Sequence, residues 1–134
     1  MKILISACLC KERCRYDGRD CFRKEVMDLL AGHEIVPVCP EAYLGIPRSP
    51  CEILNGRLID KNGEDLTESM QESITKILNE VHLESIDLAI LKARSPTCGY
   101  GWIFDGNFKN RLIYGYGMFA KALADRGIRI LEVD

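Results

Sequence analysis

The residues best suited to chemistry in this sequence are its cysteines, seven in 134 residues. Three of them follow short apolar segments that have the composition of β-strands: Cys8, Cys39 and Cys98. Thiolates are preferred ligands of soft metal centres, including zinc and iron–sulfur clusters. These three cysteines are therefore the first candidates for a metal site.

The segments that precede these cysteines are predicted to be strands of one sheet. Residues 2–7 and 34–38 end directly before a cysteine, and residues 86–91 end a few positions before the third. In an open parallel sheet, ligands bind in the crevice beyond the carboxyl ends of the strands. Thiols that are remote in sequence are thus expected to meet at one edge of the sheet.

Spacing alone leaves the identity of the metal open. Each cysteine by itself has a structural interpretation, because buried cysteine packs like a small apolar residue. Structural zinc takes four ligands, and a 4Fe–4S cluster is normally held by four cysteines, so three would leave one iron free to act as a Lewis acid. Cys10, Cys14, Cys21 and Cys51 could supply a fourth ligand, although we interpret them as incidental thiols of a reducing compartment.

Polar and aromatic residues near these cysteines have two interpretations each. Glu41 follows Cys39 closely and is a candidate general base, or else a solvated loop residue. Ser95 is a candidate partner for substrate or water, or else a helix cap. Tyr16 and Trp102 could stack on a flat ring or pack on the protein.

The rest of the sequence predicts elements that would position these residues. The expected order is strand–helix–strand–hairpin–helix–strand–loop–helix–strand, which is typical of an α/β fold. We expect a Rossmann-like, mostly parallel sheet of about four strands with covering helices and a small β-hairpin insertion. Apart from the three strands above, the predicted elements are helices near 22–30, 66–81 and 118–126, a hairpin at 52–59, and a strand at 129–133. Asp65 and Glu68 resemble a capping box.

Length and composition restrict the class of protein. A chain of this length is expected to form a single domain, 1–134. Apolar residues make up 47%, yet no apolar run approaches the roughly 18 residues of a membrane span. The net charge of −2 disfavours a long nucleic-acid partner and leaves a small molecule possible. The amino-terminal segment resembles a strand more than a signal peptide, so a cytoplasmic location is expected.

Several motifs together resemble the thiouracil desulfidase (TudS) family. They cover the chain from end to end and keep the family's order: residues 6–9 (SACL), 14–18 (CRYDG), 37–41 (PVCPE), 61–67 (KNGEDLT), 91–99 (LKARSPTCG), 104–108 (FDGNF) and 127–129 (GIR). The resemblance implies an iron–sulfur enzyme that converts the C=S group of a thiolated nucleobase or nucleotide to C=O and releases sulfide without a redox step. An alternative is a non-catalytic zinc or thiol redox sensor that uses the same cysteines.

The resemblance also implies roles for individual residues. A 4Fe–4S cluster would bind Cys8, Cys39 and Cys98, and the family's catalytic glutamate and serine fall on Glu41 and Ser95. Two departures concern the substrate and the ligands. Cys10 stands near Cys8, where it would be a possible fourth ligand, and Tyr116 occupies a position that is commonly acidic.

Overall fold

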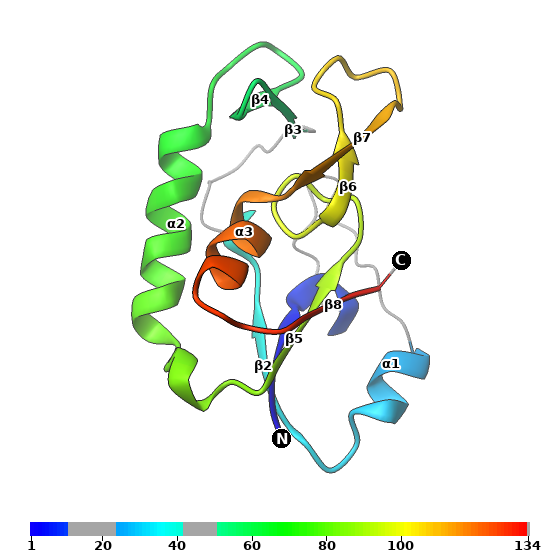
Figure 1. Ribbon diagram of the computed structural model, residues 1–134, viewed down its shortest axis with the longest axis vertical. Coiled ribbons are helices and arrows are strands. Elements are labelled where there is room, and N and C mark those ends of the chain that lie inside the picture. The colour runs from blue at the N-terminus through cyan, green and yellow to red at the C-terminus, as the bar shows by residue number, and fades with distance from the viewer. Residues whose placement is uncertain (11–23, 42–50, 134) are drawn as a thin grey trace.

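A central parallel sheet organises the computed structural model, which describes residues 1–10, 24–41 and 51–133 (Figure 1). Its strands are β1 (Lys2–Ser6), β2 (Glu34–Val38), β5 (Leu88–Lys92) and β8 (Ile130–Val133). They lie side by side in the order β2-β1-β5-β8, and every neighbouring pair is parallel. This sheet confirms the predicted α/β fold with four parallel strands.

Both faces of the sheet are buried, as the alternation of side chains along β1 shows. Leu4 belongs to one apolar core, whereas Ile3 and Ile5 belong to the other. The first core is completed by α2 (Thr67–Glu80) and α3 (Met118–Asp125), which contribute Met70, Ile74, Ile77, Phe119, Ala120 and Leu123.

The second core is smaller and includes partly buried residues of α1 (Lys24–Leu29). Figure 1 shows α1 on the opposite side of the sheet from α2. There are also two short 3-10 helices, η1 (Ala7–Cys10) and η3 (Leu83–Ser85), and residues 40–41 have 3-10 geometry. None of the helices described is both long enough and apolar enough to cross a membrane.

Two antiparallel hairpins lie beyond the carboxyl edge of the sheet. β3 (Cys51–Leu54) and β4 (Arg57–Asp60) form the predicted hairpin, and Asn55 and Gly56 both have the positive φ that a tight two-residue turn requires. β6 (Tyr100–Phe104) and β7 (Leu112–Tyr116) form the second. The carboxylate of Glu52 joins the two hairpins, because its Oε1 accepts hydrogen bonds from the amides of Gly106 and Phe108 at 3.0 and 3.2 Å.

The predicted capping box is wrong in detail. Helix α2 begins at Thr67, its N-cap residue is Leu66, and no side chain caps it. Asp65 instead accepts a hydrogen bond from the Thr67 amide at 2.9 Å and another from Arg57 Nε at 2.9 Å. These bonds lower the pKa of Asp65 to about 2, those from Thr67 contributing most. The contact of Asp65 with β4 therefore determines how helix α2 begins.

Candidate functional site

Three cysteines lie at the carboxyl edge of three adjacent strands. Cys8 lies in η1, immediately after β1, and Cys39 follows β2 directly. Cys98 lies in the loop between β5 and β6. Because β2, β1 and β5 are neighbours and run in parallel, their carboxyl ends share one edge. Cys8 and Cys98 are buried, and Cys39 is half-buried.

The pKa of Cys98 depends on several of the neighbouring candidate residues. Burial raises the pKa of the Cys98 thiol well above its ordinary range, and a hydrogen bond with Ser6 opposes this effect. Negative charge on Glu41, Cys8 and Cys39 raises the pKa further. The Glu41 carboxylate and the thiols of Cys8 and Cys39 thus each lie within electrostatic reach of Cys98. Ionising all three thiols here would require a positive centre to balance them.

Hydrogen bonds hold both the carboxylate of Glu41 and the backbone just before it. Its Oε1 accepts a hydrogen bond from Thr97 Oγ1 at 2.9 Å. The carbonyl of the preceding residue, Pro40, accepts a hydrogen bond from Ser73 Oγ at 2.6 Å. Ser73 lies on α2, so this helix anchors the loop that carries Glu41.

Ser95 organises the turn that carries Cys98. Its Oγ accepts hydrogen bonds from the amides of Thr97 and Cys98, both at 3.1 Å. Its carbonyl accepts a third from the Gly99 amide at 2.8 Å. Ser95 therefore caps a tight turn, close to the helix-cap role that was one of its two predicted interpretations.

Helix α3 fixes the same turn from the other side. The amides of Met118 and Phe119 donate to the carbonyls of Pro96 and Thr97 at 3.0 and 2.8 Å. Gly117 precedes the helix, and a Cβ at this position would lie 2.5 Å from both the carbonyl carbon and the oxygen of Thr97. The loop and the helix thus approach each other as closely as glycine allows.

Thr97 and Ser73 belong to the site, although the sequence analysis did not identify them. Both are buried, with exposed fractions of 1% and 4%. A detectable signal existed for Ser73, since it is a polar residue on the apolar stripe that includes Met70, Ile74 and Ile77. For Thr97, the only signal in the sequence was its position next to Cys98.

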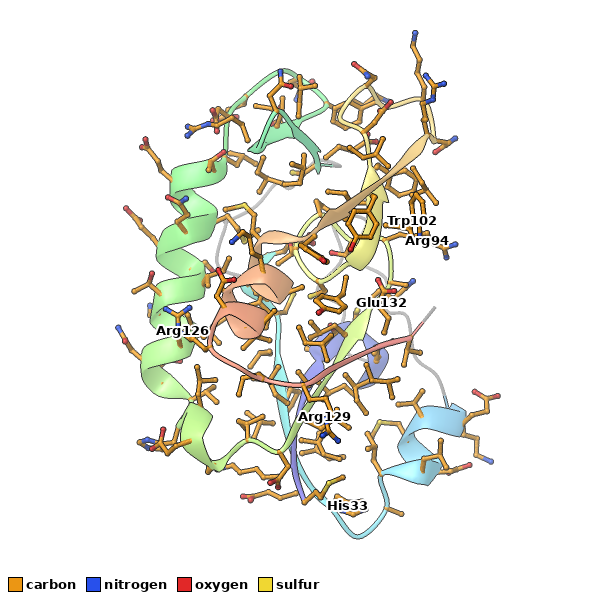
Figure 2. All side chains as sticks on the ribbon, viewed as in Figure 1. His33, Arg94, Trp102, Arg126, Arg129 and Glu132 are labelled. Atoms are coloured by element: carbon orange, nitrogen blue, oxygen red, sulfur yellow. The ribbon has the colours of Figure 1, made fainter. Side chains whose placement is uncertain are left out.

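Several of the other candidate residues lie outside the described part of the chain. Cys51 begins β3, in the hairpin beyond this edge, and packs against the first core, to which Cys98 also belongs. Cys10 ends η1, and its side chain is outside what the structure describes, as are Cys14, Cys21 and Tyr16. The two histidines are exposed, and His33 lies at the opposite, amino-terminal edge of the sheet (Figure 2).

Trp102 is part of an exposed aromatic face on the second hairpin. It is 54% exposed and contacts Tyr114 edge to face, with ring centroids 6.0 Å apart. On the same face Tyr100 and Tyr116 stack with centroids 4.9 Å apart. Figure 2 shows Trp102 on this hairpin, above Glu132 of β8, whose carboxylate accepts a hydrogen bond from the Tyr100 amide at 2.7 Å. Trp102 is therefore not a core residue.

Side chains that could ligate a single metal ion do not group together in the described part of the chain. Within residues 1–10, 24–41 and 51–133, no three side chains of His, Cys, Asp or Glu are close enough to hold one metal ion together. In a cluster, by contrast, each thiolate binds a different iron, so the ligands need not converge on one point.

Comparisons with known proteins agree with the motifs. The family model described as 2-thiouracil desulfurase matches residues 3–134. The chain is similar to the protein YbbK of Bacillus subtilis (strain 168), named as uncharacterized, with 33% identity over 142 residues, covering 97% of this chain and 94% of YbbK. It is also similar to the solved structure of the [4Fe–4S]-dependent thiouracil desulfidase TudS, with a TM-score of 0.87 and 31% identity, covering 98% of this chain and 89% of that one. This chain therefore belongs to the 2-thiouracil desulfurase family.

Proposed function

We propose that this protein is a [4Fe–4S]-dependent desulfidase that converts the C=S group of a thiouracil-type base or its nucleotide to C=O. One molecule of water supplies the oxygen and the sulfur leaves as sulfide, so no electron donor is needed. The observation that supports the proposal is that Cys8, Cys39 and Cys98 follow three adjacent parallel strands, with Glu41, Cys8 and Cys39 in electrostatic reach of Cys98. Membership of the family and the likeness to TudS support it.

Cys8, Cys39 and Cys98 would hold the cluster. A buried group of thiols would need bound cations in order to ionise. When bound, the cluster supplies an iron without a protein ligand, a soft Lewis acid that suits a thiocarbonyl sulfur. Membership of the family and the likeness to TudS favour this cluster over the alternative zinc or thiol redox sensor.

Glu41 would be the general base. Its carboxylate lies in electrostatic reach of Cys98, and one oxygen is already fixed by Thr97. We infer that it takes a proton from the water that attacks the ring carbon. The proton held by Glu41 goes to the sulfur, and the Glu41 carboxylate then takes the remaining proton from the carbon-bound hydroxyl. The electron pair of the C–S bond leaves with sulfur as hydrosulfide, the carbonyl forms, and Glu41 releases its proton to the solvent.

Ser95 would orient the substrate or the water. A serine hydroxyl has two acceptor positions and one proton to donate. Amides of Thr97 and Cys98 already occupy the Oγ as donors. The hydroxyl proton is thereby directed outward from the turn, where a polar atom of the substrate or the attacking water can accept it.

Anaerobic reconstitution tests the proposal. Iron and acid-labile sulfide are measured first, and then sulfide release from 2-thiouracil, 4-thiouracil and their nucleotides. Glu41→Gln should keep the iron and lose roughly 10²- to 10⁴-fold in kcat, whereas Cys98→Ala should lose both iron and activity.

Two controls make these results specific. Glu80→Gln changes an exposed glutamate at the end of α2, and Cys51→Ala removes a thiol from the β3 strand. Both variants should keep iron and activity. Zinc in place of iron, or Glu41→Gln turning over at the wild-type rate, would contradict the proposed chemistry.

A further inference from the structure

We propose that Thr97 is a positioning residue: its hydroxyl holds the carboxylate of Glu41 in the orientation that desulfuration requires. This inference rests on the proposed function and adds a residue to it. The contact that carries it is the 2.9 Å hydrogen bond from Thr97 Oγ1 to Glu41 Oε1, which joins residues 56 positions apart in the chain.

Thr97 is itself held rigidly enough to act as a positioning residue. Its amide donates to Ser95 Oγ at 3.1 Å, and its carbonyl accepts from the amides of Phe119 and Ala120 at 2.8 and 3.1 Å. Its exposed fraction is 1%, and a β-branched side chain has few rotamers to choose from. The direction of the hydroxyl is therefore determined by the loop and by α3.

The backbone near Glu41 is fixed separately from its carboxylate. Glu41 follows Cys39 in a short 3-10 turn, and the carbonyl of Pro40 is anchored to Ser73 of α2. That anchor acts on the backbone and not on the carboxylate. A hydrogen bond from a neutral hydroxyl to an ionised carboxylate is strong and directional, so Thr97 constrains the orientation of the Glu41 carboxylate.

A purely structural role makes different predictions. A buried hydroxyl needs a hydrogen-bond partner wherever it occurs, and losing that bond lowers stability. Thr67 provides the comparison, since it is 2% exposed and its Oγ1 accepts a hydrogen bond from the Leu58 amide at 2.8 Å, away from the cysteines. If Thr97 were only structural, replacing it would affect the protein as replacing Thr67 does.

The experiment compares Thr97→Val, Thr97→Ser and the control Thr67→Val in the reconstituted protein. Valine keeps the shape and removes the hydroxyl, and serine restores the hydroxyl. Thr97→Val should lower kcat about 10-fold or more with unchanged iron content and little change in KM. Thr97→Ser should stay within about 3-fold of the wild type, and Thr67→Val should lose stability without losing kcat.

A double-mutant cycle with Glu41→Gln identifies the residue through which Thr97 acts. In the Glu41→Gln background, Thr97→Val should cause no further loss of kcat, and the two substitutions should shift the urea unfolding midpoint non-additively. Equal kcat for Thr97→Val and wild type, or full additivity in both measurements, would overturn this inference alone. An iron-loaded wild type that releases no sulfide from any thiouracil would overturn the proposed function, and this inference with it.

Discussion

Replacing Gly117 by alanine should damage the site through a single methyl group. The backbone at Gly117 has φ −64° and ψ 156°, which alanine adopts without strain. The effect is therefore steric. The added Cβ would lie 2.5 Å from the carbonyl carbon and the oxygen of Thr97 and 2.8 Å from the amide nitrogen of Cys98.

The size of the effect follows from these distances. Ordinary contact begins at 3.4 Å, so the loop and the start of α3 must separate by about 0.9 Å. All three contacted atoms belong to the backbone, which cannot rotate away as a side chain can. Overpacking of this kind costs about 1–3 kcal/mol, and the rigid neighbours place Gly117→Ala near the upper end, a fall in Tm of roughly 10 °C.

In Gly117→Ala, catalytic activity should fall further than the loss of stability alone would cause. The displaced atoms belong to the residue that contacts Glu41 and to a proposed cluster ligand. A misplacement of about 1 Å can cost roughly 10²-fold in rate. Thermal unfolding, iron content and sulfide release measured on the same preparation separate these effects.

Gly127→Ala is the matched control at the other end of α3. No atom lies within 4 Å of the added Cβ, but φ is +78°, so this variant should lose about 1 kcal/mol through backbone strain and keep its iron and its kcat. The steric reasoning fails if Gly117→Ala proves as stable and as active as the wild type, or if the two variants behave alike in iron content and rate.

Two further substitutions test individual hydrogen bonds. Ser73→Ala should leave the buried Pro40 carbonyl without its 2.6 Å hydrogen bond and lower the unfolding free energy, measured by urea unfolding, by about 1–3 kcal/mol. Steady-state kinetics should show a larger effect on kcat than on KM. An unchanged midpoint of urea unfolding would show that α2 does not anchor the segment that carries Glu41. The pKa of Asp65 is lowered from 3.8 to about 2 by hydrogen bonds from Thr67 and Arg57, so its ionised form stabilises the fold above about pH 4 and that contribution disappears as the pH falls towards 2. The difference in Tm between the wild type and Asp65→Asn should accordingly be constant above pH 4 and vanish near pH 2, and a difference that grows on acidification would refute this assignment.

Much of the architecture was predictable from local pattern. The conformational preferences of a few neighbouring residues determine the short apolar strands, the apolar stripe of α2 and the Asn55-Gly56 turn. The structure confirms the sheet, helices and hairpin that these preferences predict. Placing Cys8, Cys39 and Cys98 at one edge needed only the rule that parallel strands share a carboxyl end. Their roles as ligands, and those of Glu41 and Ser95 in catalysis, stay predictions.

The start of α2 shows where local pattern was insufficient. Asp65 and Glu68 fit a capping box in sequence, yet the hydrogen bonds of Asp65 go to Thr67 and to Arg57 of β4. A carboxylate bonds to whichever donors the tertiary fold brings near it, and a sequence motif contains only the donors close to it along the chain.

Sequence alone thus determined the elements, their order and which cysteines gather, because periodicity and strand direction are written into short stretches of residues. Only the tertiary structure decided how Glu41 is held, since the bonds Thr97–Glu41 and Ser73–Pro40 join residues 56 and 33 positions apart. Such contacts depend on how one loop packs against a helix to within a fraction of an ångström. No pattern of neighbouring residue types carries that information.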